Sequence, residues 1–180
     1  MQLLALPAFI YAFWKIKALW WSLPQSPSDN YSQESKIKII FFCFGLLVFY
    51  VYQIFFPLFQ IDNFFYSFTV SLGYLCLYLG FWLCKMALEA LGNNWSSLLE
   101  YQVKKGQKLI TTGIYKYFRH PLYLGDILWL TGLELVLNSW LFIPLSILIF
   151  LLFKIHSRQE DKLLSDNFKE WLGYHPKINI

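Results

Sequence analysis

The chain has 180 residues, of which 57% are hydrophobic, 21% aromatic and only 14% charged, and its mean hydropathy is +0.44. Soluble domains carry roughly 25% charged residues, so this composition argues against a water-soluble protein and favours one embedded in a bilayer. The net charge of +4 does not form a basic stripe with the spacing of a nucleic-acid site, so we expect no nucleic-acid partner.

Three membrane helices are predicted in the first half of the chain. The apolar segment 3–21 is interrupted by two lysines near its end, where lysine side chains can reach back to water. The segments 39–59 and 64–88 are long apolar runs, and about 20 such residues cross the hydrocarbon core as a helix. We therefore expect residues 1–88 to form an N-terminal three-helix membrane region.

Two glycines of the segment 64–88 lie seven residues apart, and therefore on one face of the predicted helix. Gly73 and Gly80 would let a neighbouring helix approach closely at that face, because glycine has no side chain to hold two backbones apart. Glycine is also frequent in membrane helices in general. The sequence leaves both interpretations open.

The second half of the chain predicts a helical hairpin flanked by polar segments. Residues 89–120 form the longest polar segment, and the apolar runs 122–137 and 140–155 are separated only by Asn138 and Ser139. Each run has about 16 residues, or roughly 24 Å of helix, which is short for a full span. The chain from Lys154 onward is polar and is predicted to be a partly helical tail.

These segments predict an all-α integral membrane protein with about five transmembrane helices, the last two forming a C-terminal helical hairpin. If the N-terminus lies outside, all fifteen lysines and arginines fall on the cytoplasmic side, and none falls in the two short outer loops, 60–63 and 138–139. This distribution follows the positive-inside rule. It also places the polar segments of residues 89–180, which we expect to form a second region that carries the functional site, on one side of the membrane.

Charged residues flank both cytoplasmic ends of the predicted hairpin. Arg119 and His120 precede the fourth helix, whereas His156, Arg158 and Glu160 follow the fifth. Arginine binds carboxylates, and histidine exchanges protons near neutral pH, so the two clusters together would suit a polar, zwitterionic cofactor in a cytoplasmic pocket. Each cluster alone also fits a simpler interpretation, a basic turn at the membrane surface or an i,i+4 pair on a solvated helix.

Several common kinds of site are not predicted. The three cysteines, Cys43, Cys76 and Cys84, stand in apolar runs without a CxxC partner and are expected to be buried thiols. The three histidines show no HxxxH or HExxH spacing, so we expect no metal. The absence of GxSxG, GxGxxG and Walker motifs argues against a serine hydrolase and against a nucleotide fold of the soluble type.

The stretch from Gly113 to Gly125, GIYKYFRHPLYLG, resembles the signature of the isoprenylcysteine carboxyl methyltransferase family and its bacterial relatives. The residues KLITT at 108–112 and EDKLL at 160–164 resemble the same family. The resemblance runs from about residue 91 to residue 174. It implies an integral-membrane methyltransferase that uses S-adenosyl-L-methionine.

The resemblance also implies roles for individual residues. Arg119, His120 and Glu160 would be catalytic, and His156 and Arg158 would face the substrate. This chain departs from the family at His156, where the family has a substrate-contacting arginine, and at Trp171, where it usually has a tyrosine. The cofactor would contact Gln107, Lys108, Leu109, Ile110, Tyr115, His120, Pro121, Leu122, Tyr123 and Glu160.

The implied substrate is lipophilic, a prenylated carboxylate or another small molecule that arrives among the membrane lipids. A carboxylate has a pKa near 4, so at neutral pH it is already nucleophilic and needs no base, whereas a lipid amine would need a proton removed by Glu160 or His120. Two further classes stay open, an NADPH-dependent sterol-type reductase, whose family shares an arginine-histidine-proline stretch, and a non-catalytic membrane scaffold. The short loops favour a bacterial inner membrane, with the site facing the cytoplasm.

Overall fold

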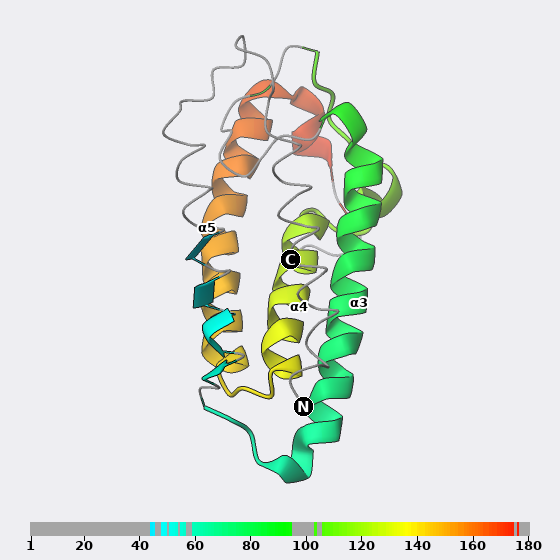
Figure 1. Ribbon diagram of the computed structural model, residues 1–180. Helices are drawn as coiled ribbons and strands as arrows, with labels where there is room; N and C mark the ends of the chain where they lie inside the picture. Colours follow the sequence, from blue (N-terminus) through cyan, green and yellow to red (C-terminus); the bar gives the residue numbers. More distant parts are fainter. Residues whose placement is uncertain are drawn as a thin grey trace.

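The structure, a computed structural model, describes residues 44–45, 48–49, 51–53, 55–56, 59–94, 103, 106–174 and 176. Within these residues the chain is helical and contains no β-strand, which confirms the all-α prediction for this part (Figure 1). The long helices are α3 (Tyr66–Leu91), α4 (Pro121–Val136) and α5 (Phe142–Asn167). Short 3-10 helices flank them: η2 (Asn63–Phe65), η3 (Gly92–Asn94), η4 (Gly113–Lys116) and η5 (Lys169–Gly173).

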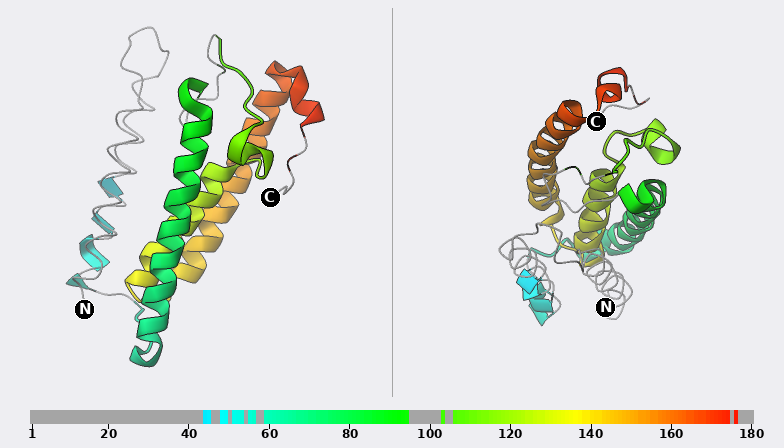
Figure 2. Two further views of the ribbon diagram at one scale, coloured as in Figure 1. Left: turned by 90° about the vertical axis from the view of Figure 1, so that its right-hand side faces the viewer. Right: turned by 90° about the horizontal axis from the view of Figure 1, so that it is seen from above.

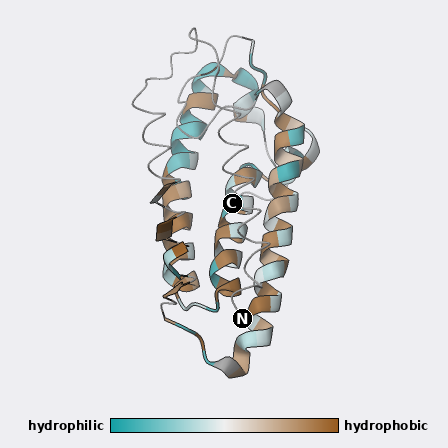
Figure 3. Ribbon diagram, viewed as in Figure 1, coloured by the Kyte–Doolittle hydropathy of each residue, from teal (hydrophilic) through white to brown (hydrophobic). Residues whose placement is uncertain are grey.

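Two of the described helices, α3 and α5, are long and apolar enough to cross a membrane. The predicted helix 3–21 lies outside the described residues, and the segment 39–59 is described only as short helical pieces between residues 44 and 55. The number of spans therefore stays a prediction. Figure 3 shows that the apolar first half of α5 gives way to a hydrophilic second half.

Helices α3 and α4 lie side by side and pack backbone against backbone (Figures 1 and 2). A Cβ atom added at Gly80 would lie 2.7 Å from the carbonyl oxygen of Gly125, and one added at Gly132 would lie 2.8 Å from the carbonyl oxygen of Gly73. The prediction that Gly73 and Gly80 admit a neighbouring helix is confirmed. The neighbour is α4, which contributes its own pair of glycines with the same spacing.

Helices α4 and α5 form the predicted hairpin, but α5 is longer than the sequence indicated. It has 26 residues and ends at Asn167, whereas the apolar run predicted a helix over 140–155. The extension has a local reason: residues 154–167 contain no glycine or proline, so nothing breaks the helix where its composition turns polar. The change of composition marks the edge of the apolar region and not the end of the helix.

The two connections at the closed end of the hairpin are joined by hydrogen bonds. The Ile61 amide donates to the Asn138 carbonyl at 2.8 Å, and the Trp140 amide donates to the Phe59 carbonyl at 2.8 Å. The buried Asn138 side chain donates to the Ile61 carbonyl at 2.9 Å and accepts from the Thr69 hydroxyl at 2.7 Å. Asn138 has a φ of +55°, a conformation that asparagine tolerates better than most residues. These bonds fix the turn between α4 and α5.

The buried Glu134 carboxylate in α4 forms hydrogen bonds with a residue that precedes α3. Glu134 is 0% exposed and Gln53 is 2% exposed, and the Gln53 amide donates to the two carboxylate oxygens of Glu134 at 3.1 and 3.2 Å. Both residues lie inside apolar runs, and the sequence pattern did not predict that they pair. An amide and a carboxylate that satisfy each other avoid the penalty of burying either one alone.

We expect the Glu134→Ala variant to lose about 2–4 kcal/mol of unfolding free energy, because the buried Gln53 amide would be left without this acceptor. The Glu134→Gln variant keeps an acceptor at the same place and should lose less than half of that amount. Thermal unfolding in detergent, followed by tryptophan fluorescence, measures both. Equal stability of the alanine variant and the wild type would show that the pair contributes nothing.

Candidate active site

The site begins at the junction between η4 and α4. Gly113 has a φ of +63°, a conformation that glycine adopts without strain, and it starts η4. Pro121 is the first residue of α4, and a proline there keeps the preceding residue out of the helical region. His120 accordingly has φ −126° and ψ 64°. This geometry holds Arg119 and His120 at the mouth of the hairpin.

Helix α5 brings two carboxylates to His120. The imidazole Nε2 lies 2.9 Å from Asp161 Oδ1, and Nδ1 lies 3.4 Å from Glu160 Oε2. The Tyr123 hydroxyl donates to Glu160 Oε2 at 2.6 Å, and the Tyr123 ring stacks on His120 with centroids 5.3 Å apart. The start of α4 and the second half of α5 therefore meet, as the hairpin predicted. Asp161 was not among the predicted site residues, although it stands in the EDKLL stretch that carries the resemblance.

The carboxylates keep His120 charged. Burial of the side chain, which is 10% exposed, opposes the charged form, but the hydrogen bonds and charges of Asp161 and Glu160 outweigh it and raise the pKa of His120 from 6.5 to about 9. At neutral pH the imidazolium donates from both ring nitrogens. It is thus suited to holding an anion or a carboxylate in place, and is a poor general base.

The raised pKa of His120 predicts a pH dependence of stability. Below the unfolded-state pKa of 6.5 the stabilisation by the imidazolium is fully present, and it is lost as the pH rises through the folded-state pKa of about 9. We expect unfolding free energy to fall by roughly 2 kcal/mol between pH 6.5 and pH 9.5. The His120→Gln variant should lack this component when denaturant unfolding is followed across the same range; an identical slope in both proteins would contradict the assignment.

The C-terminal segment fixes Arg119. The guanidinium lies 3.5 Å from the Asp161 carboxylate and donates to the Tyr174 carbonyl at 3.3 Å, and its carbon lies 5.0 Å from the centroid of the Trp171 ring. Trp171, where the family usually has a tyrosine, therefore supplies a cation–π contact. The Arg119 Nε atom is buried and has no hydrogen-bond partner among the described residues.

Tyr115 closes the site from η4. Its backbone carbonyl accepts from the Tyr174 hydroxyl, and its ring packs against the buried residues Leu83, Ala87 and Ile114. Burial and the neighbouring Glu160 carboxylate raise the pKa of the Tyr115 hydroxyl well above its ordinary value. Tyr115 is therefore neutral and able to donate a hydrogen bond within the site.

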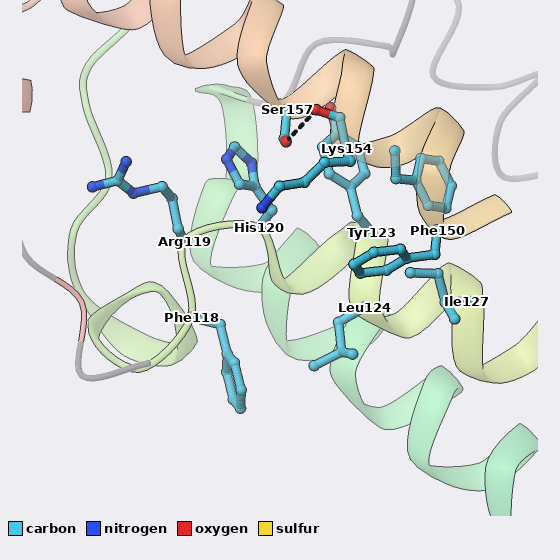
Figure 4. A pocket seen from close by; sticks show the side chains of 10 residues that line it. Phe118, Arg119, His120, Tyr123, Leu124, Ile127, Phe150, Lys154 and Ser157 are labelled. Carbon is cyan, nitrogen blue, oxygen red and sulfur yellow. Dashed lines mark hydrogen bonds between the residues drawn. The ribbon is translucent and has the colours of Figure 1, made fainter. Parts of the chain in front are cut away.

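A cavity of about 130 Å³ lies between α4 and α5, and Arg119 and His120 are part of its lining (Figure 4). His156 and Arg158, which the resemblance implies face the substrate, are not among the residues that line this cavity. Their contact with substrate stays a prediction. Helix α5 presents other side chains to it. The lining residues are Phe118, Arg119, His120, Tyr123, Leu124, Ile127, Phe150, Phe153, Lys154 and Ser157.

The other predicted cofactor contacts occupy the chain between α3 and η4. The Gln107 side chain donates to the Asn94 carbonyl at 3.0 Å, and the Lys108 amide donates to the Asn94 side chain at 2.7 Å. Leu109 and Ile110 are half-buried. These bonds tie the segment to the end of α3, and its contact with a cofactor stays a prediction.

Comparison with known proteins identifies the family of this chain. The sequence model of the phospholipid methyltransferase family matches residues 68–170, more than half of the chain. Protein-S-isoprenylcysteine O-methyltransferase of Saccharomyces cerevisiae is 33% identical over 115 residues, which cover 61% of this chain and 46% of that protein. The enzyme of the same name from Schizosaccharomyces pombe is 38% identical over 87 residues, 47% of this chain and 36% of that protein. This chain thus spans less than half the length of these relatives.

A solved structure has the same fold. It is the eukaryotic intramembrane Ras methyltransferase called isoprenylcysteine carboxyl methyltransferase, which matches with a TM-score of 0.61 over 94% of this chain and 62% of that chain, at 23% identity. The names of the relatives confirm the family resemblance found in the sequence. The chain is an integral membrane protein and belongs to the phospholipid methyltransferase family.

Proposed function

We propose that the protein is an S-adenosyl-L-methionine-dependent membrane methyltransferase that O-methylates the carboxylate of an isoprenylcysteine-like or other lipophilic substrate. One observation carries the proposal: His120 at the start of α4 meets Glu160 and Asp161 of α5 at the mouth of a largely apolar cavity. Polar groups there suit a water-soluble donor, and the apolar walls suit a lipid acceptor.

The residues present fit the donor molecule. Its amino group and ribose hydroxyls need acceptors, which Glu160 and Asp161 supply, and its carboxylate needs a cation, which Arg119 or His120 supplies. The unpartnered Nε of Arg119 leaves a donor available in the site. When bound, this cofactor supplies an activated methyl group on a sulfonium. The remaining task of the chain is to position the acceptor and keep water away.

The charge state of His120 favours a carboxylate acceptor. A carboxylate is nucleophilic without losing a proton, whereas an ammonium headgroup must be deprotonated first. With a pKa of about 9, His120 is protonated at neutral pH and cannot take that proton. O-methylation of a carboxylate therefore requires no proton transfer in this site, whereas N-methylation of a lipid amine does. The relatives named above are methyltransferases, which favours methyl transfer over NADPH-dependent reduction.

We also propose an orientation in the membrane and a role for each half of the chain. Residues 89–180 would carry the catalytic groups and residues 1–88 the membrane region. The end of the molecule where α3 and α5 finish carries the hydrophilic colours (Figure 3), and it holds Lys85, Lys108 and Arg158. By the positive-inside rule this end faces the cytoplasm. A bacterial inner membrane is the proposed location.

Transfer of labelled methyl from S-adenosyl-L-methionine tests the function. The purified protein in lipid nanodiscs is offered an S-prenylated cysteine with a free carboxylate, the matching amide, and phosphatidylethanolamine. We expect label in the first acceptor alone, released by mild alkali as methanol because it is held as an ester. Alkali-stable label in phosphatidylethanolamine would instead establish N-methylation, and calorimetric binding of NADPH without label in any acceptor would support a reductase.

A further inference from the structure

Lys154 is a cavity residue that neither the resemblance nor the mechanism above uses. It lies six residues before Glu160 on α5, about 9 Å closer to the hairpin turn along the helix axis, and it lines the cavity between α4 and α5. Figure 4 shows its side chain extending from α5 across the cavity toward the side that carries His120. The Ser157 hydroxyl donates to the backbone carbonyl of Lys154 at 3.1 Å, so this bond does not involve the lysine amine.

The balance of charge near the cavity distinguishes the Lys154 amine from the other charged groups. Arg119 and the protonated His120 carry two positive charges, and these face the two negative charges of Glu160 and Asp161 at 2.9–3.5 Å. These four groups therefore balance. Lys154 makes no ion pair within the part of the chain that the structure describes, so it adds one uncompensated positive charge to the cavity.

Lys154 is itself exposed, but the wall of the cavity beside it is apolar. Tyr123 and Phe153 stack with ring centroids 4.8 Å apart, and Ile127 and Phe150 continue the wall toward the hairpin turn. A charge beside such walls interacts more strongly with a partner than it would in open water. The cavity therefore combines lipophilic walls with a single net positive charge near the methyl-donor groups, which is the complement of a lipid-linked anion.

We propose that Lys154 is the specificity-determining residue of the site: it pairs with the carboxylate of the lipophilic acceptor and so selects acids over amines. This inference rests on the proposed function. In the transfer step a carboxylate oxygen forms a bond to the methyl carbon while the bond from that carbon to sulfur breaks, and sulfur keeps the electron pair. No proton moves. The product ester is neutral, so its attraction to Lys154 is lost and it leaves the site more readily than the acid.

The assignment of substrate contact to Lys154 differs from the one that the sequence indicated. The resemblance places a substrate-contacting residue at His156, and Arg158 was the nearest arginine, yet neither lines the cavity, whereas Lys154 does. On a helix, residues 150, 153, 154 and 157 fall within one face, because three and four residues bring the chain round by about one turn. The cation of this enzyme would thus sit about half a turn earlier on α5 than in the family pattern.

Acid and ester forms of one acceptor test the proposal. The probes are an S-prenylated cysteine with a free carboxylate and its methyl ester, bound to the wild-type protein in nanodiscs without cofactor and measured by calorimetry. We expect the acid to bind roughly ten-fold more tightly than the ester, as a charge-assisted pair implies. In the Lys154→Gln variant the two should bind equally, with ester affinity unchanged. Equal binding of acid and ester by the wild type would overturn the proposal.

Kinetics separate a specificity role from a structural one. For Lys154→Gln we expect KM for the acid to rise roughly ten- to thirty-fold with kcat altered less than about three-fold, and Lys154→Arg should restore KM. Lys162→Gln, an exposed lysine of the same helix that does not line the cavity, is the matched control and should behave as the wild type. A fall in kcat at constant KM would refute the proposed pairing. Absence of methyl transfer by the wild type would instead refute the proposed function.

Discussion

Replacing Glu160 with alanine is expected to abolish cofactor binding and to lower kcat/KM for methyl transfer by at least about thirty-fold. Glu160 Oε2 accepts the Tyr123 hydroxyl at 2.6 Å and lies 3.4 Å from His120 Nδ1. Its loss removes the acceptor proposed for the amino group or hydroxyls of the cofactor. It also leaves the Tyr123 hydroxyl and His120 Nδ1 without this partner. Truncating one partner of a hydrogen-bonded charge pair costs about 2–5 kcal/mol, which corresponds to this loss or more.

Calorimetry with S-adenosyl-L-methionine and the labelled-methyl assay measure this effect. His120→Ala should have the same outcome, because it removes the group that both carboxylates face. Asp166→Ala is the matched control, since Asp166 is an exposed acidic residue of the same helix. Cofactor binding retained in both Glu160→Ala and His120→Ala would rule out this end of the hairpin as the site.

Replacing Gly80 with alanine is expected to lower the unfolding midpoint by roughly 2–12 °C and to reduce activity with it. The added methyl group would lie 2.7 Å from the Gly125 carbonyl oxygen and 2.8 Å from the Trp129 amide nitrogen. Both atoms belong to the backbone of α4, so no side chain can rotate to make room and the two helices must separate. Overpacking of this kind costs about 1–3 kcal/mol, and each kcal/mol shifts the midpoint of a chain of this size by about 2–4 °C.

Separation of α3 from α4 would also reach the site, because α4 carries His120 at its start. A displacement of about 1 Å in a catalytic constellation can cost a hundred-fold in rate, so kcat should fall more than the modest stability loss alone implies. Gly173→Ala is the matched control, since a methyl group there meets nothing within 4 Å. A Gly80→Ala protein with wild-type stability and rate would show that the close approach of these helices is dispensable.

Several features of the site were accessible from sequence because they depend on short segments. The proline after His120 and the glycine at the start of η4 set the backbone locally, so the position of Arg119 and His120 at the start of α4 was predictable. The contact between His120 and Glu160 was also predictable, because two antiparallel helices joined by a short turn have their free ends on the same side. Spacing alone placed Gly73 and Gly80 on one face but did not identify α4 as the partner.

The sequence by itself thus determined the three long helices, apart from the length of α5, together with the hairpin and the charged groups at its mouth, because hydrophobic runs and turn residues act over a few neighbouring positions. Only the tertiary structure decided that Asp161 pairs with His120 and Arg119, that Glu134 pairs with Gln53, and that Lys154 lines the cavity. These contacts join residues distant in sequence, and the rotation of each helix about its own axis selects them. That rotation is set by how the backbones pack, which no single segment encodes.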